Sequence, residues 1–173
     1  MQIFHKSGLW QTLTKAFLGL GILGGISAAS AEAKEAQVVV KSGELGGFEN
    51  NDKIFSGKVK VTYLFKDAPY RPFGGGLVEF SKGARSAWHT HPSGQTLIVV
   101  DGEIYTGTEA GVVQIARKGD TILCPPNLKH WHGAGLKQSG AHIALTGVKD
   151  GKNVVWLEKL SDKEYNEAIK KAK

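Results

Sequence analysis

Most of the chain after residue 57 consists of short runs in which apolar and polar residues alternate. A period of two places successive side chains on opposite faces of a strand, so each run predicts a half-buried β-strand. Glycine or proline separates the runs about every ten residues, which is typical of an antiparallel sandwich or barrel. The runs are KVKVTYLF, GLVEF, SAWHTH, QTLIVV, VVQIA, DTILC, KHWHGA, HIALTG and NVVWLE.

One helix is predicted, near the carboxyl end. Ser161 begins the sequence SDKE, which has the Ser-x-x-Glu pattern of a capping box, and Tyr165 and Ile169 then fall four residues apart on one face. Residues 32–56 are small, polar and rich in glycine, and we interpret them as an arm that leads into the domain. The sequence therefore predicts one all-β domain over residues 57–173, ending in this short helix.

Residues 1–31 have the pattern of a secretory signal peptide. Lys6 and Lys15 precede the apolar run AFLGLGILGGI, and the small residues SAASA follow it. The apolar run is shorter than the roughly 20 residues that a helix needs to span a bilayer. We expect cleavage near Ala31, a periplasmic or secreted mature protein, and no membrane partner after cleavage. An uncleaved anchor or a buried helix is the alternative.

Charge and cysteine content exclude some classes of partner and of covalent link. The net charge is +6, but the basic residues are scattered apart from the terminal IKKAK, so no nucleic-acid partner is predicted. A small-molecule substrate is the expected partner. Cys124 is the only cysteine, which rules out an intramolecular disulfide.

Polar side chains gather on two of the predicted strands. His89 and His91 alternate, so they leave the same face, and the turn Pro-Ser-Gly brings Gln95 back beside them. His130 and His132 repeat the alternation in the run KHWHGA. Both pairs predict imidazole groups that converge on one side of the sheet.

His142 adds a fifth imidazole. If its strand pairs antiparallel with the preceding one about residue 137, His132 and His142 lie opposite each other. Several neutral imidazoles are costly to bury without partners, and a divalent cation satisfies their lone pairs together. Imidazole and amide ligands suit Mn, Fe, Co, Ni, Cu or Zn, and the spacing does not choose among them. A set of hydrogen-bonded core histidines is the alternative.

The two histidine segments resemble the two sequence motifs of the cupins. GARSAWHTHPSGQTLIVVDG fits the first motif, and GDTILCPPNLKHWHGA fits the second, with Asn127 where glycine is commoner. The resemblance implies a cupin-type double-stranded β-helix, or jelly-roll barrel, with a metal inside one end, and a homodimer. It implies four metal ligands, which are His89, His91, Gln95 and His130.

Residues 37–168 further resemble the small bacterial cupins that include the manganese-dependent hydroxynitrile lyases. This likeness implies one divalent transition metal per subunit, with Mn expected first and Fe, Co, Ni or Zn as alternatives. His132 and His142 match two histidines that face the open side of the metal, where they would act as general acid/base groups. Thr146 stands where those lyases carry a glutamine that lines the pocket.

Three hypotheses for the function follow. The first is an exported metal-dependent lyase that cleaves or forms a carbon–carbon bond beside a hydroxyl or carbonyl, as in the cleavage of a cyanohydrin to an aldehyde and cyanide. The second is an iron-dependent dioxygenase of a small aromatic or diol substrate, because the same ligands bind Fe(II). The third is a non-catalytic barrel that binds a metal or a small ligand.

Overall fold

The computed structural model describes residues 37–172, so the predicted signal peptide lies outside the described residues. The chain divides into two units, Met1–Gln37 and Val38–Lys173, and the second contains all of the elements discussed below. Among residues 37–172, no helix has the length and apolar character needed to cross a membrane.

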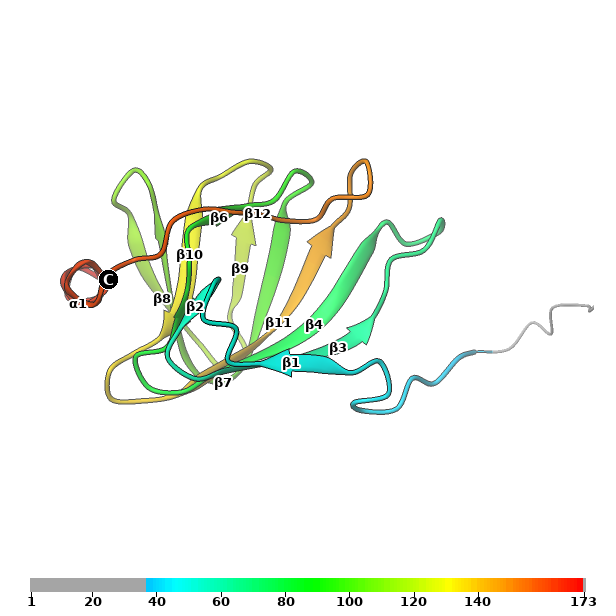
Figure 1. Cartoon of the computed structure of the whole chain (residues 1–173), viewed down its shortest axis with the longest axis horizontal. Coiled ribbons are helices and arrows are strands. Elements are labelled where there is room, and N and C mark those ends of the chain that lie inside the picture. The colour runs from blue at the N-terminus through cyan, green and yellow to red at the C-terminus, as the bar shows by residue number, and fades with distance from the viewer. Residues whose placement is uncertain (1–36, 173) are drawn as a thin grey trace, which may run out of the picture. The chain divides into compact units, whose positions relative to one another are not determined.

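The described residues form twelve antiparallel strands in one sheet that curls around an interior (Figure 1). The main path of hydrogen-bonded neighbours runs β1-β3-β4-β11-β7-β10-β5-β2. The strands are β1 (Gly47–Glu49), β2 (Phe55–Ser56), β3 (Val59–Phe65), β4 (Phe73–Phe80), β5 (Arg85–Ser86), β6 (His89–Thr90), β7 (Gln95–Thr108), β8 (Val113–Arg117), β9 (Thr121–Cys124), β10 (His130–Ala134), β11 (Gly140–Gly147) and β12 (Val155–Trp156).

Strand β7 belongs to both halves of the curled sheet. Its first residues pair with β9 and β11, and its last residues pair with β8 and β10. The run QTLIVV predicted a strand that ends at Val100, and that boundary is wrong. Gly102 has φ +57, and β11 carries a register shift between Ala141 and His142, so the strand bends there and continues to Thr108.

The core lies inside the curl, on the faces that the alternation of residues predicts. Its largest cluster includes Phe55, Val59, Val78, Phe80 and Ile104, each no more than 8% exposed. Burying one such side chain contributes about 1.5–3 kcal/mol relative to leaving it in water. The all-β prediction is confirmed.

The predicted helix is α1 (Asp162–Ile169), and Ser161 is its N-cap. Ser161 Oγ accepts from the amide of Glu164, and the amide of Ser161 donates to the Glu164 carboxylate, at 3.2 and 2.8 Å. Both halves of the capping box therefore form, as predicted. Tyr165 is fully buried against Trp131, which fixes the helix on the outside of β10.

Residues 32–56, expected to be an arm, contain two strands in their described part. β1 pairs with β3, and β2 pairs with β5. The Phe55 ring packs in the core, with its centroid 6.0 Å from that of Phe80 and 5.8 Å from that of Trp156. β1 has three residues and β2 has two, which are too few to show an alternation, so these strands were not predicted.

Candidate metal centre

All five histidines of the predicted domain converge in the interior of the curled sheet. One lies on β6, one directly after β6, two on β10 and one on β11. His89 and His130 are partners in the register of β6 with β10, and their ring centroids are 4.3 Å apart. The exposed fraction of the five side chains is 0–4%. They are His89, His91, His130, His132 and His142.

Main-chain carbonyls orient three of these rings. Nδ1–H of His89 donates to the carbonyl of Ala87 at 2.9 Å, and Nδ1–H of His130 donates to that of Leu128 at 2.8 Å. Nδ1–H of His91 donates to the carbonyl of Asn153 at 2.6 Å. A carbonyl can only accept, so each Nδ1 carries the proton and each Nε2 keeps its lone pair.

The side chain of Thr146 orients Gln95, as the carbonyls orient the histidines. Its Nε2 donates to the Thr146 hydroxyl at 2.9 Å, which leaves Oε1 free as an oxygen donor. Among residues 37–172, Oε1 of Gln95 and Nε2 of His91 and His130 are buried without a hydrogen-bond partner. In the same residues, Nε2 of His132 is likewise buried without a partner. Buried polar atoms normally have partners, so these four atoms are suited to bind an ion.

His132 and His142 form a hydrogen-bonded pair, with Nε2 of His142 3.1 Å from Nδ1 of His132. We expected this proximity from direct pairing of their strands, and that reason is wrong. β10 and β11 both pair with β7, and the two rings meet across the interior. The Phe80 ring lies against both, at centroid distances of 5.8 and 5.6 Å.

The structure groups the histidines differently from the ligand set implied by the resemblance. Donor atoms of His89, His130 and His132 lie within 4.8 Å of one another, so these three can hold a metal ion. His132, which we assigned to acid/base chemistry, is thus also placed as a ligand. His91 is not one of these three, but it lines the same pocket as His89 and His132, and Gln95 lines that pocket too.

Burial lowers the pKa of all five imidazoles, because it disfavours the charged form. The pKa of His91 falls to about 4 and that of His142 to about 3. Burial, with the neighbouring His130 next in effect, holds the pKa of His89 well below its usual value. Burial and then His142 do the same for His132, and burial lowers the pKa of His130. All five are therefore neutral near pH 7, as metal ligands must be.

The donor set fits a divalent transition metal. Neutral imidazole nitrogens with an amide oxygen suit first-row ions from Mn to Zn, and each histidine ligand has the partner that fixes its tautomer. The sequence pointed to these donors through their alternation. It gave no sign of Asn153, whose contribution is a main-chain carbonyl, or of Trp156, whose ring lies 4.8 Å from that of His89.

Four of the five histidines, all but His130, line a pocket of about 380 Å³. Several of its lining residues are aromatic: Phe48, Phe55, Tyr63, Phe65 and Trp156. Gly74 and Gly76 of β4 line it too, and Gly76 pairs in register with Ala144 of β11. Small residues on these two strands leave room in front of the donors.

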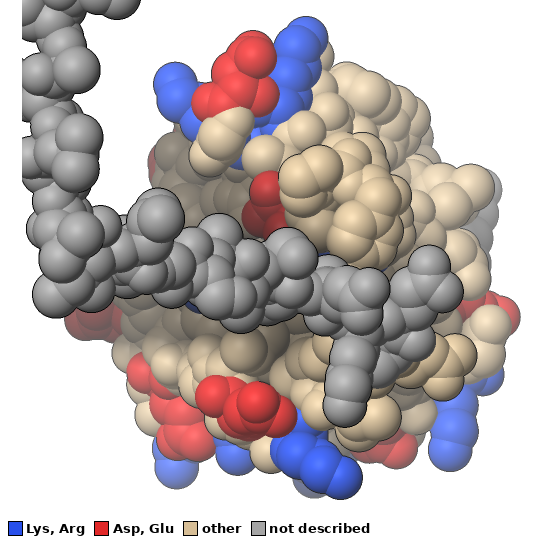
Figure 2. All heavy atoms as spheres, turned by 90° about the vertical axis from the view of Figure 1, so that its right-hand side faces the viewer, with Lys and Arg blue, Asp and Glu red and all other residues tan. Residues whose placement is uncertain are grey.

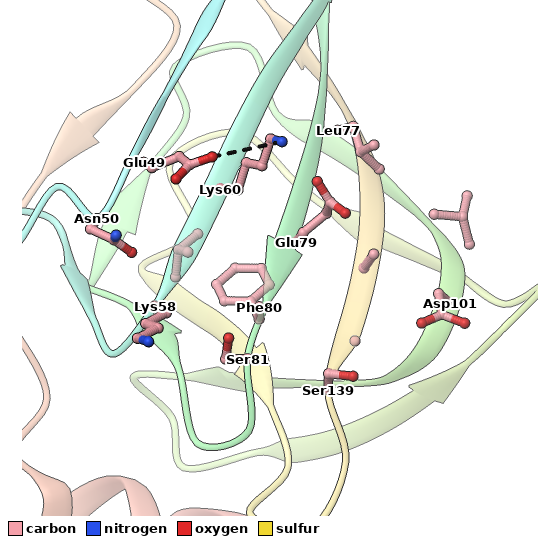
Figure 3. Close-up of a pocket in the computed structure, with 14 residues that line it drawn as sticks. Glu49, Asn50, Lys58, Lys60, Leu77, Glu79, Phe80, Ser81, Asp101 and Ser139 are labelled. Atoms are coloured by element: carbon pink, nitrogen blue, oxygen red, sulfur yellow. Dashed lines mark ion pairs between the residues drawn. The ribbon is translucent and has the colours of Figure 1, made fainter. Parts of the chain in front are cut away.

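A second hollow lies away from the histidines, over β1, β3, β4 and β11 (Figure 3). Its charged residues have both signs, and Glu49 pairs with Lys60 at 3.7 Å. Both partners of this pair are exposed to solvent, where ion pairs contribute little. The pocket with the histidines is therefore the candidate site.

Comparison with known proteins agrees with this geometry. A family model described as "Cupin domain" matches residues 76–139. The (R)-mandelonitrile lyase of Granulicella tundricola is 41% identical over 111 residues, which are 64% of this chain and 85% of the lyase. The chain belongs to the cupin family.

Solved structures agree with this fold. A cupin-like protein of Thermotoga maritima has a TM-score of 0.66 and 31% identity, over 76% of this chain and 97% of its own. The polyketide cyclase of Streptomyces resistomycificus has a TM-score of 0.50 and 18% identity, over 66% of this chain and 84% of its own. The cyclase shares the fold alone, so the reaction has to be argued from the site.

Proposed function

We propose that this cupin is a metal-dependent lyase that cleaves a cyanohydrin to an aldehyde and hydrogen cyanide. The observation that carries the proposal is the set of buried, partnerless donor atoms on His91, Gln95 and His130, beside a hydrogen-bonded histidine pair. The 41% identity to an (R)-mandelonitrile lyase supports the choice of reaction.

The proposed ligands are His89, His91, Gln95 and His130. A bound divalent metal supplies Lewis acidity to the oxygen of a hydroxyl or carbonyl. The three histidines present lone pairs because carbonyls hold their Nδ1 protons, and Gln95 presents oxygen because Thr146 accepts from its amide nitrogen. Every donor is therefore oriented by the protein before an ion arrives.

The His132–His142 pair is the proposed proton carrier. The hydrogen bond between Nδ1 of His132 and Nε2 of His142 contains one proton, and either ring can carry it. When His132 donates it to His142, Nε2 of His132 holds a lone pair. When His142 donates it, Nε2 of His132 can carry N–H. The pair can thus accept a proton from the substrate and later return it.

The proposed step balances without an oxidant or a reductant. The cyanohydrin hydroxyl gives its proton to His132, the C–O bond becomes a carbonyl, and the bond to the nitrile carbon breaks. The electron pair of that bond leaves with cyanide, which takes the proton back from the histidine pair. The products are one aldehyde and one molecule of hydrogen cyanide.

The shape of the pocket supports an aromatic cyanohydrin as substrate. The aromatic residues of the lining provide the apolar contacts that a phenyl ring requires, and Gly74 and Gly76 leave it space. A pocket of about 380 Å³ is within the range of small-ligand sites.

We further propose an exported, manganese-loaded homodimer. The signal-like residues 1–31 support export, and the mixed nitrogen and oxygen donors are compatible with Mn(II). On the face shown in Figure 2, acidic and basic side chains lie beside one another. Interspersed charges give a weaker field than a single-sign patch, which favours a small-molecule substrate over nucleic acid.

The test is an anaerobic assay of Mn(II)-reconstituted protein with both enantiomers of mandelonitrile, followed by benzaldehyde absorbance. We expect turnover without oxygen. His130→Ala should lose both metal and activity, and His142→Gln should keep the metal and lose about 100- to 10,000-fold in rate. Activity that depends on oxygen consumption would favour the dioxygenase, and tight metal binding without turnover of any cyanohydrin would favour a binding protein.

His132→Gln decides between the two roles of His132. If it is a proton carrier, the variant retains one metal per subunit and loses rate. If it is a ligand, the variant loses metal as His130→Ala does. Metal content by elemental analysis distinguishes the two results, and Val155→Ala, an exposed change, is the matched control.

A further inference from the structure

The segment between β11 and α1 crosses the candidate site. We call residues 152–162 the strap. It contains β12 and runs back past β6 to the start of α1 (Figure 1). The strap lies outside residues 76–139, which the cupin model matches.

The strap supplies the orienting partner of one proposed ligand. His89 and His130 each donate to the carbonyl two residues before them, so their own strands set their orientation. His91 donates instead to Asn153, which is 62 residues away in the chain. The tautomer of His91 therefore depends on where the strap lies, whereas those of the other two do not.

The strap also packs against a second proposed ligand. Trp156 pairs in register with His89, and its ring lies 4.8 Å from the imidazole at an angle of 44°. On its other side Trp156 meets Phe55 of the core, with centroids 5.8 Å apart. The indole thus limits the movement of His89 and lines the pocket.

The middle and the far end of the strap are held to the domain. The amide of Leu157 donates to the carbonyl of Trp88 at 2.8 Å, and the amide of Trp88 donates to that of Glu158 at 2.9 Å. Arg85 is buried in the wall of β5 and donates to the carbonyl of Leu160 at 2.9 Å. Its guanidinium also pairs with Asp162 at 2.6 Å, which holds the end of the strap.

We propose that the strap is a positioning element of the metal centre, with Asn153 and Trp156 acting through His91 and His89. The inference rests on the proposed metal site. Partners behind the ligands typically change metal affinity about 10- to 100-fold, because a ligand that must be reoriented binds less tightly. A displaced strap would leave His91 free to exchange tautomers and His89 free to rotate.

Trp156→Ala, Trp156→Phe and Asn153→Gly test the inference in the full chain. We expect Trp156→Ala to weaken Mn(II) binding by about tenfold or more, measured by calorimetry, and Trp156→Phe to recover most of the loss. Asn153→Gly keeps the carbonyl that accepts from His91 but frees the backbone that places it, so it should weaken binding as well. The visible absorption of the Co(II)-loaded protein should shift in Trp156→Ala and in Asn153→Gly. Val155→Ala, the neighbouring residue on the same strand, should behave as wild type.

A second measurement needs no metal. Imidazole ¹⁵N shifts of His91 should report the Nδ1–H tautomer in the wild type and a mixture of tautomers in Asn153→Gly and Trp156→Ala. If Trp156→Ala does not fold, Asn153→Gly and Asp162→Ala provide the test. The Asp162 side chain is 89% exposed, so its loss loosens the end of the strap without opening the core.

The outcomes separate this inference from the proposed function. A strap that only stabilises the fold would lower the melting temperature and leave the metal affinity, the Co(II) spectrum and the His91 tautomer unchanged. That result overturns the inference and leaves the metal site in place. A wild-type protein that binds no divalent metal overturns both, and a strap effect on affinity without cyanohydrin turnover supports the strap and contradicts the lyase.

Discussion

The buried histidines should make the metal-free protein sensitive to mild acid. In the native protein the pKa of His142 is about 3 and that of His91 about 4. An imidazole in the unfolded chain has a pKa near 6.5. Between these values the unfolded chain binds more protons than the native one. Stability is therefore fully present above pH 6.5 and is lost as the pH falls toward the native pKa.

The size of the loss follows from the two pKa values. One pKa unit corresponds to about 1.4 kcal/mol, so at pH 5 each of these two histidines removes roughly 2 kcal/mol from the free energy of unfolding. Burial lowers the pKa of His89, His130 and His132 in the same direction, so they add to the loss. Domains of this kind are stable by about 5–15 kcal/mol, so the effect is large.

The assay is urea unfolding of metal-free protein at several pH values between 7 and 5, a window above the range in which carboxylates titrate. His142→Gln is the matched variant, because glutamine can still hydrogen bond to His132 but does not titrate. We expect the variant to have a shallower pH slope by up to about 1.4 kcal/mol per pH unit. Equal slopes in the two proteins, or stability that is constant from pH 7 to 5, would refute the reasoning.

Three substitutions at residues that do not line the metal site test the packing and hydrogen bonds of β7, β10 and α1. Tyr165→Phe removes the hydroxyl that donates to the buried carbonyl of Ala134 at 2.7 Å, and urea unfolding should show a loss of about 1–3 kcal/mol. Gly107→Ala places a Cβ where the indole of Trp131 lies, so we expect a lower melting temperature and a disturbed near-ultraviolet spectrum; an unchanged melting temperature would contradict that contact. Ser161→Ala removes the N-cap of α1 and should cost about 1 kcal/mol in urea unfolding, with metal content unchanged.

The fold was predictable where the chain alternates and where a cap has a clear pattern. β3 begins with buried residues at every second position, as does the first part of β7, so these strands and their inward faces followed from the sequence. All five residues of β10 are buried, which alternation does not predict. Strands as short as β1 and β2 have no alternation that a sequence pattern could reveal. They form because they pair with β3 and β5. The alternating run QTLIVV stops at Val100, but β7 continues past Gly102 because its later residues pair with β10 and β8.

The candidate site was predictable as a list of donors and not as an arrangement. Alternation placed His89 with His91 and His130 with His132, because that rule is local. The contact between His132 and His142 depends on how the sheet curls, so the expected strand pairing was wrong although the rings meet. Thr146 and Asn153 have their roles because the fold brings them next to Gln95 and His91. They are far from these residues in the chain, so no short stretch of sequence reveals the contacts.

The shared strand β7 has a kinetic consequence for metal binding. Gln95 lies in the part of β7 that pairs with β9 and β11, whereas His130 lies on β10, which pairs with the other part. A folding chain that has formed only one half of the sheet holds an incomplete set of donors and binds an ion weakly. The ion then stabilises interactions that form after the main barrier, so metal should slow unfolding far more than it speeds folding. Where free metal is dilute, a loaded protein of this kind would lose its ion at the rate at which the sheet opens.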